Sequence, residues 1–327
     1  MSAVSEPSAL ALHSLGGQTM GTTWSVRLAA APSLDLHALH ARLQGELDRI
    51  VAQMSTWRDD SDITRYNCAV AGQAQDLPDE FSTVLACALD IAERSGGAYD
   101  PTIAPLVDAW GFGAHAAAPR VPDEETLAIA RAHVGWRRLR AAFAPPRLSQ
   151  PGGLRLDLSA IAKGYGVDRV AARLRTSGIP GALVEVGGEL HGYGIKPDGQ
   201  RWRVLVESAP DEEADGARYP PRVVVLDGLA IATSGDRWHH FDHGGTRYAH
   251  TLDPRSGRPV AQAAAAVSVI AADAMQADAW ATALTVMGTR DGHAFARARG
   301  LAARFVTRAD GTLEETMTPA FEARLAA

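Results

Sequence analysis

Cysteine is almost absent from this sequence, with only Cys68 and Cys87 among 327 residues. The two are not spaced as Cys-x-x-Cys, and no further cysteine is present to complete a metal knuckle or a disulfide framework. A small domain stapled by metal or disulfides is therefore disfavoured. Cys87 shares the apolar face of an expected helix with Val84 and Ile91, so we expect it to be a small core residue.

Aromatic residues are also scarce, at 6% of the chain, and the sequence has neither long apolar runs nor blocks of like charge. Hydrophobic residues make up 46% and charged residues 21%, and the mean hydropathy is -0.09, as in globular proteins with a sizeable core. This composition excludes disordered, collagenous, coiled-coil and membrane-spanning classes. Because 32 basic and 38 acidic residues give a formal charge of -6, we expect no nucleic-acid partner.

The first residues lack a basic start, an apolar stretch and an early cysteine that could carry a lipid. As written, the chain is therefore expected to be cytoplasmic. We expect residues 1–18 to form a flexible segment and residues 19–327 to form one domain. Within this domain, the acidic, proline-bearing stretch near residues 208–221 is expected to be an exposed loop.

Hydrophobic periodicity predicts helices over residues 33–54, 79–94, 123–135 and 271–288. Another helix is expected after Ser159, preceded by a short strand that ends near Asp157. Alternating, β-branched segments predict strands over residues 182–186, 201–207, 222–226, 229–234, 265–271 and 301–308. Helices and strands do not alternate regularly, and no repeat of fixed period occurs. The pattern therefore predicts an α+β fold with antiparallel strands.

Several common signatures are missing from the sequence. No G-x-G-x-x-G follows a predicted strand, and neither G-x-x-x-x-G-K-[ST], G-x-S-x-G nor H-E-x-x-H occurs. These absences disfavour a Rossmann dinucleotide site, a P-loop NTPase, a serine hydrolase and a zincin protease.

Asp278 and Thr282 lie four residues apart on a predicted helix, so their side chains project from one face about one turn apart. A carboxylate and a hydroxyl placed in this way can both bind a hard cation such as Mg²⁺, which takes few protein ligands when a substrate supplies phosphate. The alternative is that Thr282 bonds back to a helix carbonyl while Asp278 is solvated.

The segment LDLSAIAKG, residues 156–164, carries Asp157 at the end of a strand and Lys163 in the first turns of the next helix. A helix N-terminus with a lysine can bind phosphate, although an ordinary capped helix with a surface lysine has the same pattern. Gly164 and Gly166 weaken this helix, by about 1 kcal/mol each relative to alanine. They therefore indicate the close approach of another backbone or of a ligand.

His250 lies with Asp253 and Arg255 where a predicted strand ends in a turn. Histidine is the side chain best suited to accept a proton near neutral pH, which makes His250 a candidate base, although a single histidine is often structural. A short run of nitrogen and oxygen ligands offers an alternative transition-metal site; it consists of Asp236, His239, His240, Asp242 and His243.

Eight segments, taken in order, resemble the ApbE family of FAD:protein FMN transferases. They are GQTMGTTWSVRL, MSTWRDDSDITRYN, GGAYDPTIAPLVDAWGFG, LDLSAIAKGYGVDRV, LVEVGGEL, ATSGD, YAHTLDPRSGRPV and ADAWATAL. The resemblance covers most of the chain. It implies an α+β architecture related to the T-fold, with antiparallel sheets and packed helices, together with FAD as the donor substrate and a requirement for Mg²⁺.

The resemblance also implies roles for particular residues. The FAD site would be lined by Met20, Trp57, Ala98, Tyr99, Asp100, Asp157, Lys163 and Leu252. Mg²⁺ would be held by the carbonyl of Ala160 and by Asp278 and Thr282, and His250 would be the base. The family more often has tyrosine where this sequence has Trp57; both rings can stack on a flavin or an adenine, but they differ in their hydrogen-bonding group.

The implied reaction is attack by a threonine hydroxyl of an acceptor flavoprotein on the FMN-side phosphorus of FAD, with AMP as the leaving group. With water as the nucleophile, the same site would be an FAD pyrophosphatase that yields FMN and AMP. A non-catalytic FAD carrier is a further alternative, disfavoured because a carrier needs none of Asp278, Thr282 and His250.

Overall fold

A computed structural model describes residues 10–326, except 115, 117, 207–221, 236–239, 261–263, 265, 310 and 311. Its centre is an eight-stranded sheet in which every neighbouring pair is antiparallel, in the order β1-β2-β6-β7-β10-β15-β16-β17. The strands are β1 (Ala11–Thr19), β2 (Thr22–Ala30), β6 (Gly181–Val186), β7 (Glu189–Tyr193), β10 (Leu229–Ser234), β15 (Ala266–Ala271), β16 (Ala302–Ala309) and β17 (Thr312–Met317). The predicted α+β fold with antiparallel strands is confirmed.

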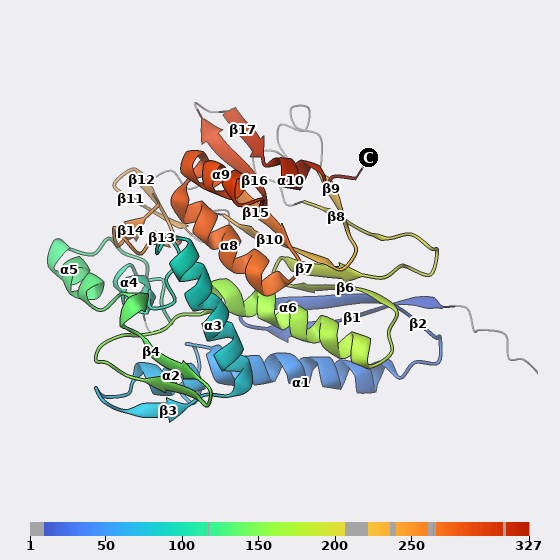
Figure 1. Ribbon diagram of the computed structural model, residues 1–327, viewed down its shortest axis with the longest axis horizontal. Helices are drawn as coiled ribbons and strands as arrows, with labels where there is room; N and C mark the ends of the chain where they lie inside the picture. Colours follow the sequence, from blue (N-terminus) through green and yellow to red (C-terminus); the bar gives the residue numbers. More distant parts are fainter. Residues whose placement is uncertain are drawn as a thin grey trace, which may run out of the picture.

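Helices cover one face of this sheet, and Figure 1 shows the longest of them lying across it. They are α1 (Leu36–Met54), α3 (Asp79–Arg94), α6 (Ser159–Thr176), α8 (Ala274–Met287) and α9 (Thr289–Ala298). Apolar side chains of α3, α6 and α8 form one core cluster, and those of α1 and α6 form a second one against β2 and β6. The core therefore lies mainly between the sheet and this helical layer.

A smaller core lies between the sheet and a two-stranded ribbon, and it contains Val224, Ile231, Ile270 and Phe321. The elements that cover the sheet here are β8 (Trp202–Leu205), β9 (Val223–Leu226) and α10 (Pro319–Glu322). Both faces of the sheet thus carry buried apolar side chains.

The remaining elements lie toward one end of the helical layer (Figure 1). One group consists of α2 (Asp62–Asn67), β3 (Ala74–Asp76), β4 (Arg140–Phe143) and β5 (Pro146–Ser149). The other consists of α4 (Ala104–Ala109), α5 (Glu124–Ala132), the 3-10 turn η1 (Trp136–Arg138), β11 (His240–His243), β12 (Thr246–Ala249), β13 (Leu252–Asp253) and β14 (Arg258–Pro259). Among the residues that the structure describes, none of the helices is long and apolar enough to span a membrane.

The structure corrects the prediction that residues 1–18 are flexible. Residues 11–19 form β1, which pairs with β2 along its whole length, from Ala11 opposite Ala30 to Thr19 opposite Thr22. Backbone hydrogen bonds to a neighbouring strand order this segment although its glycines and polar residues give it little apolar character. Residues 1–9 lie outside the described part of the chain, as does the whole of the predicted acidic loop at 208–221.

Two other local predictions differ in detail. The helix predicted to begin at residue 33 begins at Leu36, because the side chain of Asp35 caps α1 by accepting a hydrogen bond from the Ala38 N–H at 2.9 Å. The strand predicted before Asp157 is reduced to one parallel bridge between Ile103 and Arg155, because this segment lies beside a loop instead of a neighbouring strand.

Candidate active site

The first turn of α6 is distorted at Ala160, one of the predicted metal ligands. Ala160 has φ -90° and ψ 20°, which is outside the helical region. The N–H of Gly164, four residues after Ala160 on α6, donates to Oδ2 of Asp278 at 3.1 Å. This geometry joins α6 to α8 and directs one carboxylate oxygen toward the turn that contains the Ala160 carbonyl.

Gly164 also explains why α6 and α8 can approach so closely. A Cβ atom at this position would lie 2.2 Å from the carbonyl oxygen of Ala274 and 2.8 Å from the Cα of Met275. Asp168, one turn further along α6, accepts hydrogen bonds from the N–H groups of Ala274 and Met275, both at 2.9 Å. The close backbone approach predicted from the glycines is therefore confirmed at Gly164.

Lys163 lies between two buried carboxyl groups. Its Nζ is 3.0 Å from Oε1 of Glu189 and 3.6 Å from Oδ2 of Asp278. Burial would lower the pKa of Lys163, but the charges of Asp278 and Glu189 outweigh burial and raise it. Lys163 is therefore a fixed cation, and its side chain is still 27% exposed, so a ligand can reach it.

The carboxyl groups respond in the opposite sense. Burial raises the pKa of Asp278, against the opposing effects of Lys163 and the Gly164 N–H. Burial likewise raises the pKa of Glu189 to about 8, with Lys163 acting against the shift. When both carboxyl groups are ionised, the two carboxylates and the one ammonium carry a net negative charge, which burial disfavours. The cluster is therefore suited to bind an added cation.

Sequence reasoning missed Glu189 as a site residue. Its side chain is 4% exposed, and its Oε2 has no hydrogen-bond partner among the described residues. Glu189 lies opposite Val186 and His191 lies opposite Val184 in the β6–β7 pair, so both polar residues share the face of these buried valines. The sequence signal was the alternation along LVEVGGEL, because side chains alternate between the two faces of a strand and a tight turn places Glu189 opposite Val186.

The loop that contains Ala98, Tyr99 and Asp100 lies beside this cluster. Tyr99 is buried, and burial together with the charges of Asp278 and Asp157 raises the pKa of its hydroxyl well above its usual value. The N–H of Asp157 donates to the carbonyl of Pro101 at 2.9 Å. The structure thus places Tyr99 near both Asp278 and Asp157.

Asp100 differs from these residues because its carboxylate is occupied locally. Oδ1 accepts from the N–H and the hydroxyl of Thr102, at 2.8 and 2.6 Å, and Oδ2 accepts from the N–H of Trp136 at 3.1 Å. Asp100 therefore fixes the loop that follows Tyr99. Any contact that it makes with a ligand must share these oxygens.

Thr282 is half-buried one turn after Asp278 on α8. Within the described residues its hydroxyl has no hydrogen bond to a helix carbonyl, whereas Thr285 has one to Ala281 at 2.8 Å. Asp278 is 5% exposed. Both halves of the alternative interpretation, a back-bonded Thr282 and a solvated Asp278, are wrong.

His250 and Leu252 lie beside an aromatic cluster. The rings of Phe112 and His250 meet edge to face, with centroids 6.4 Å apart at 75°, and Tyr248 stacks on Phe241 at 5.2 Å. Leu252 is buried in the adjoining apolar cluster. The chain from Tyr99 to Phe112 connects this region with the Lys163 cluster.

Met20 lies in the β1–β2 turn, and Trp57 follows the end of α1. Met20 has a positive φ of 48°, and its Cε lies 3.3 Å from where a Cβ at Gly166 would be, so it packs against α6. Trp57 follows α1 and is 70% exposed. The structure does not join Trp57 to the Lys163 cluster, and its ring is available as an outer wall.

The alternative metal site near residue 240 gains no support. Asp236 and His239 lie outside the described residues, and His240, Asp242 and His243 form a strand in which Asp242 faces Arg247 at 3.7 Å. No group of three or more His, Cys, Asp or Glu side chains in the described part of the chain is arranged to hold a metal. The Ala160, Asp278 and Thr282 set has a single carboxylate and is a different kind of site.

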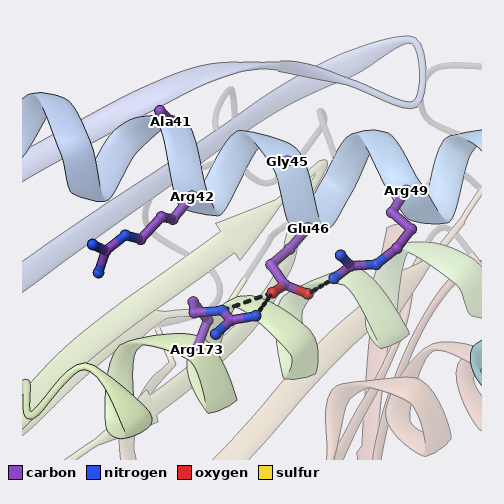
Figure 2. A pocket seen from close by; sticks show the side chains of 6 residues that line it. All are labelled: Ala41, Arg42, Gly45, Glu46, Arg49 and Arg173. Carbon is purple, nitrogen blue, oxygen red and sulfur yellow. Dashed lines mark hydrogen bonds and ion pairs between the residues drawn. The ribbon is translucent and has the colours of Figure 1, made fainter.

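A surface pocket of about 390 Å³ lies between α1 and α6, away from Lys163. Figure 2 shows that Glu46 at its base is bound by Arg49 and Arg173, while Arg42 extends away from it. Glu46 also accepts a hydrogen bond from Arg169 at 3.2 Å. Because its carboxylate is already neutralised by arginines, we interpret this pocket as an ion-pair network that joins two helices, not as the active site.

Comparisons of sequence and of structure with known proteins point to one family. Residues 20–305 match the model of the ApbE family. The chain is 35% identical to an FAD:protein FMN transferase of Vibrio cholerae, over 94% of this chain and 91% of the relative, and 30% identical to that of Escherichia coli K12, over 95% and 88%. The apo crystal structure of the Pseudomonas stutzeri flavinyl transferase ApbE superposes with a TM-score of 0.89 at 37% identity, covering 97% of this chain and 98% of that one.

Proposed function

Because the chain belongs to the ApbE family and is a flavin transferase, we propose that it transfers FMN from FAD to a threonine hydroxyl of an acceptor flavoprotein. The transfer breaks the bond between the FMN phosphorus and the bridging oxygen of the diphosphate. AMP leaves with that oxygen, and the threonine oxygen forms a phosphoester with FMN. Mg²⁺ is the proposed metal.

The residues at the first turns of α6 and α8 suit a hard cation. The Ala160 carbonyl, the Asp278 carboxylate and the Thr282 hydroxyl would hold Mg²⁺, and all three are oxygen donors. The non-helical backbone at Ala160 and the hydrogen bond from the Gly164 N–H to Asp278 bring the two helices together at this point. When bound, Mg²⁺ supplies positive charge next to the phosphate oxygens.

The side chains of this protein would supply the remaining functions. Lys163 is positively charged and partly exposed, so it can bind a diphosphate oxygen as a point charge. Trp57 and Tyr99 would contact the flavin or the adenine, together with Met20. His250 would accept the hydroxyl proton of the acceptor threonine, since general bases of this kind are most often histidines.

One observation carries this proposal: a lysine and a buried aspartate, from helices far apart in sequence, lie 3.6 Å apart beside a distorted helix turn. An FAD carrier could bind the diphosphate through Lys163 alone and needs no buried carboxylate at that point. Burying Asp278 is unfavourable unless a cation compensates it.

The test is an assay with FAD, Mg²⁺ and a candidate acceptor flavoprotein. We expect a fluorescent protein adduct that carries the mass of one phosphoester-linked FMN, with one AMP released for each adduct. Replacing the acceptor threonine by alanine should abolish the adduct. Equal amounts of free FMN and AMP without an adduct would indicate the pyrophosphatase, and intact FAD would indicate the carrier.

The metal ligands are tested by Asp278→Asn, which preserves side-chain volume and removes the charge. We expect this variant to lose Mg²⁺-dependent transfer. The matched control is Asp90→Asn, which removes a carboxylate that is 56% exposed on α3 and should transfer FMN at the normal rate. Normal transfer by Asp278→Asn at low Mg²⁺ would exclude Asp278 as a ligand.

A further inference from the structure

Glu189 is a buried charged residue that the proposed reaction does not use. It opens β7, and its side chain is 4% exposed. Oε1 accepts a hydrogen bond from Lys163 Nζ at 3.0 Å, whereas Oε2 has no partner within the described part of the chain. Burying a carboxyl group with one oxygen left without a hydrogen bond is unfavourable for folding. We therefore ask what Glu189 does for Lys163, the side chain that it contacts.

The two carboxyl groups compete for one ammonium group. Lys163 Nζ is nearer to Glu189, at 3.0 Å, than to Asp278, at 3.6 Å. An ammonium that moved fully onto Asp278 would neutralise that carboxylate and occupy an oxygen that a cation requires. The position of Nζ therefore affects how readily Asp278 can bind a metal ion.

The hairpin that carries Glu189 also confines the lysine side chain. Gly187 has a φ of +59°, and a Cβ at this position would lie 3.2 Å from Cδ of Lys163 and 2.8 Å from Cγ2 of Thr22. The N–H of Gly188 donates to Oε1 of Glu185 at 2.9 Å, which braces the turn. The β6–β7 turn thus packs against the lysine stem and presents an acceptor to its end.

We propose that Glu189 is a positioning residue for Lys163, which it holds away from Asp278 so that this carboxylate is available to a divalent cation. The inference rests on the proposed function, because it takes Asp278 as a metal ligand. It predicts that Glu189 affects metal affinity only through Lys163.

The experiment is calorimetric titration of the enzyme with Mg²⁺ alone, without flavin. It is run at about pH 9, above the pKa of Glu189 of about 8, so that the wild-type carboxyl group is ionised. Glu189→Gln keeps the shape of the side chain but is a weaker acceptor for an ammonium. Because the released ammonium would pair with the ligand Asp278, we expect Mg²⁺ affinity to fall about 10- to 100-fold, the range typical of changes to groups around a metal ligand.

The second arm repeats the substitution in a Lys163→Met background, where no ammonium competes for Asp278. Here Glu189→Gln should change Mg²⁺ affinity less than about twofold, because coupled residues lose their effect when the partner is absent. An equal loss in both backgrounds would show that the Glu189 charge acts directly on the metal and would overturn the inference. Unchanged affinity in the wild-type background would overturn it as well.

Controls separate this inference from the proposed function. Glu185→Gln removes a charge from the same hairpin, but Glu185 binds Ser25 and Gly188, so Mg²⁺ affinity should be unchanged. Asp278→Asn must abolish Mg²⁺ binding; if it does not, the metal assignment fails and the inference with it. If Asp278→Asn loses binding and Glu189→Gln does not, only the inference fails.

Thermal melts check that each variant folds. If Glu189→Gln does not fold, Glu189→Asp, whose carboxylate is one methylene shorter, is compared in the same two backgrounds. It is held to the same expectation: a loss of affinity that disappears in the Lys163→Met background.

Discussion

Replacing Gly164 by alanine tests the contact that joins α6 to α8. The added Cβ would lie 2.2 Å from the carbonyl oxygen of Ala274 and 2.8 Å from the Cα of Met275. Both are backbone atoms and cannot rotate out of the way as the end of a side chain can. The two helices must therefore separate, which lengthens the hydrogen bond of 3.1 Å from the Gly164 N–H to Asp278.

The size of the effect follows from three contributions. Alanine stabilises a helix interior by about 1 kcal/mol relative to glycine. Overpacking a tight contact costs about 1–3 kcal/mol, and losing a hydrogen bond to a buried charged group costs about 1.5–3 kcal/mol. The unfavourable contributions exceed the gain, so we expect Gly164→Ala to lower the free energy of unfolding by about 1.5–5 kcal/mol.

The assay is denaturant unfolding of the purified variant together with FMN transfer. The matched control is Gly45→Ala in the middle of α1, where an added Cβ has no atom within 4 Å; this variant should be as stable as the wild type or up to about 1 kcal/mol more stable. Gly164→Ala should also transfer FMN more slowly, because Asp278 moves relative to Ala160. Wild-type stability and rate in Gly164→Ala would refute this account of the helix contact.

Three further predictions concern other parts of the molecule. Trp57→Ala should weaken FAD binding by about 1–3 kcal/mol without slowing the bound complex, and Trp57→Tyr should bind normally; lower turnover at unchanged FAD affinity, measured by fluorescence titration, would contradict this. His250→Asn should lower the rate of FMN transfer by roughly 10²- to 10⁴-fold with FAD affinity nearly unchanged, whereas joint loss of binding and thermal stability would make His250 structural. Burial would raise the pKa of Glu46, but hydrogen bonds from Arg173 and Arg49 lower it below 4.5, so its contribution to stability is present above pH 4.5 and is lost as the pH falls through the folded pKa. Glu46→Gln should therefore reduce the free energy of unfolding by about 2 kcal/mol at neutral pH and by less below pH 4.5, and a difference that does not change with pH in denaturant titrations would refute this.

Local patterns in the sequence predicted those parts of the site that depend on one helix. The four-residue spacing of Asp278 and Thr282 holds on α8, and the costly glycines of α6 do mark a close backbone contact at Gly164. Both signals are local because helix geometry fixes which residues share a face.

Features that depend on packing between distant segments could not be predicted in the same way. Glu189 meets Lys163 only because β7 lies beneath α6, and 26 residues separate them. Asp278 is buried because α8 is covered on nearly all sides, although a single carboxylate in a helix is usually solvated. Strand β1 was missed because its partner strand β2, not its own side chains, orders its backbone.

The central sheet is a meander in which several pairs of neighbouring strands are joined by long connecting segments, here called excursions. Strand order in space follows strand order in the chain, and each excursion leaves and re-enters at adjacent antiparallel strands: between β2 and β6, β7 and β10, β10 and β15, and β15 and β16. The register places the two ends of an excursion side by side, as with Ala29 opposite Gly181 and Ser234 opposite Val267. Since neighbouring strands are only about 5 Å apart, an excursion can be lengthened, shortened or exchanged without moving the sheet. The walls around Lys163, His250 and Asp278 belong to three different excursions, so each wall can diverge separately on one unchanged frame.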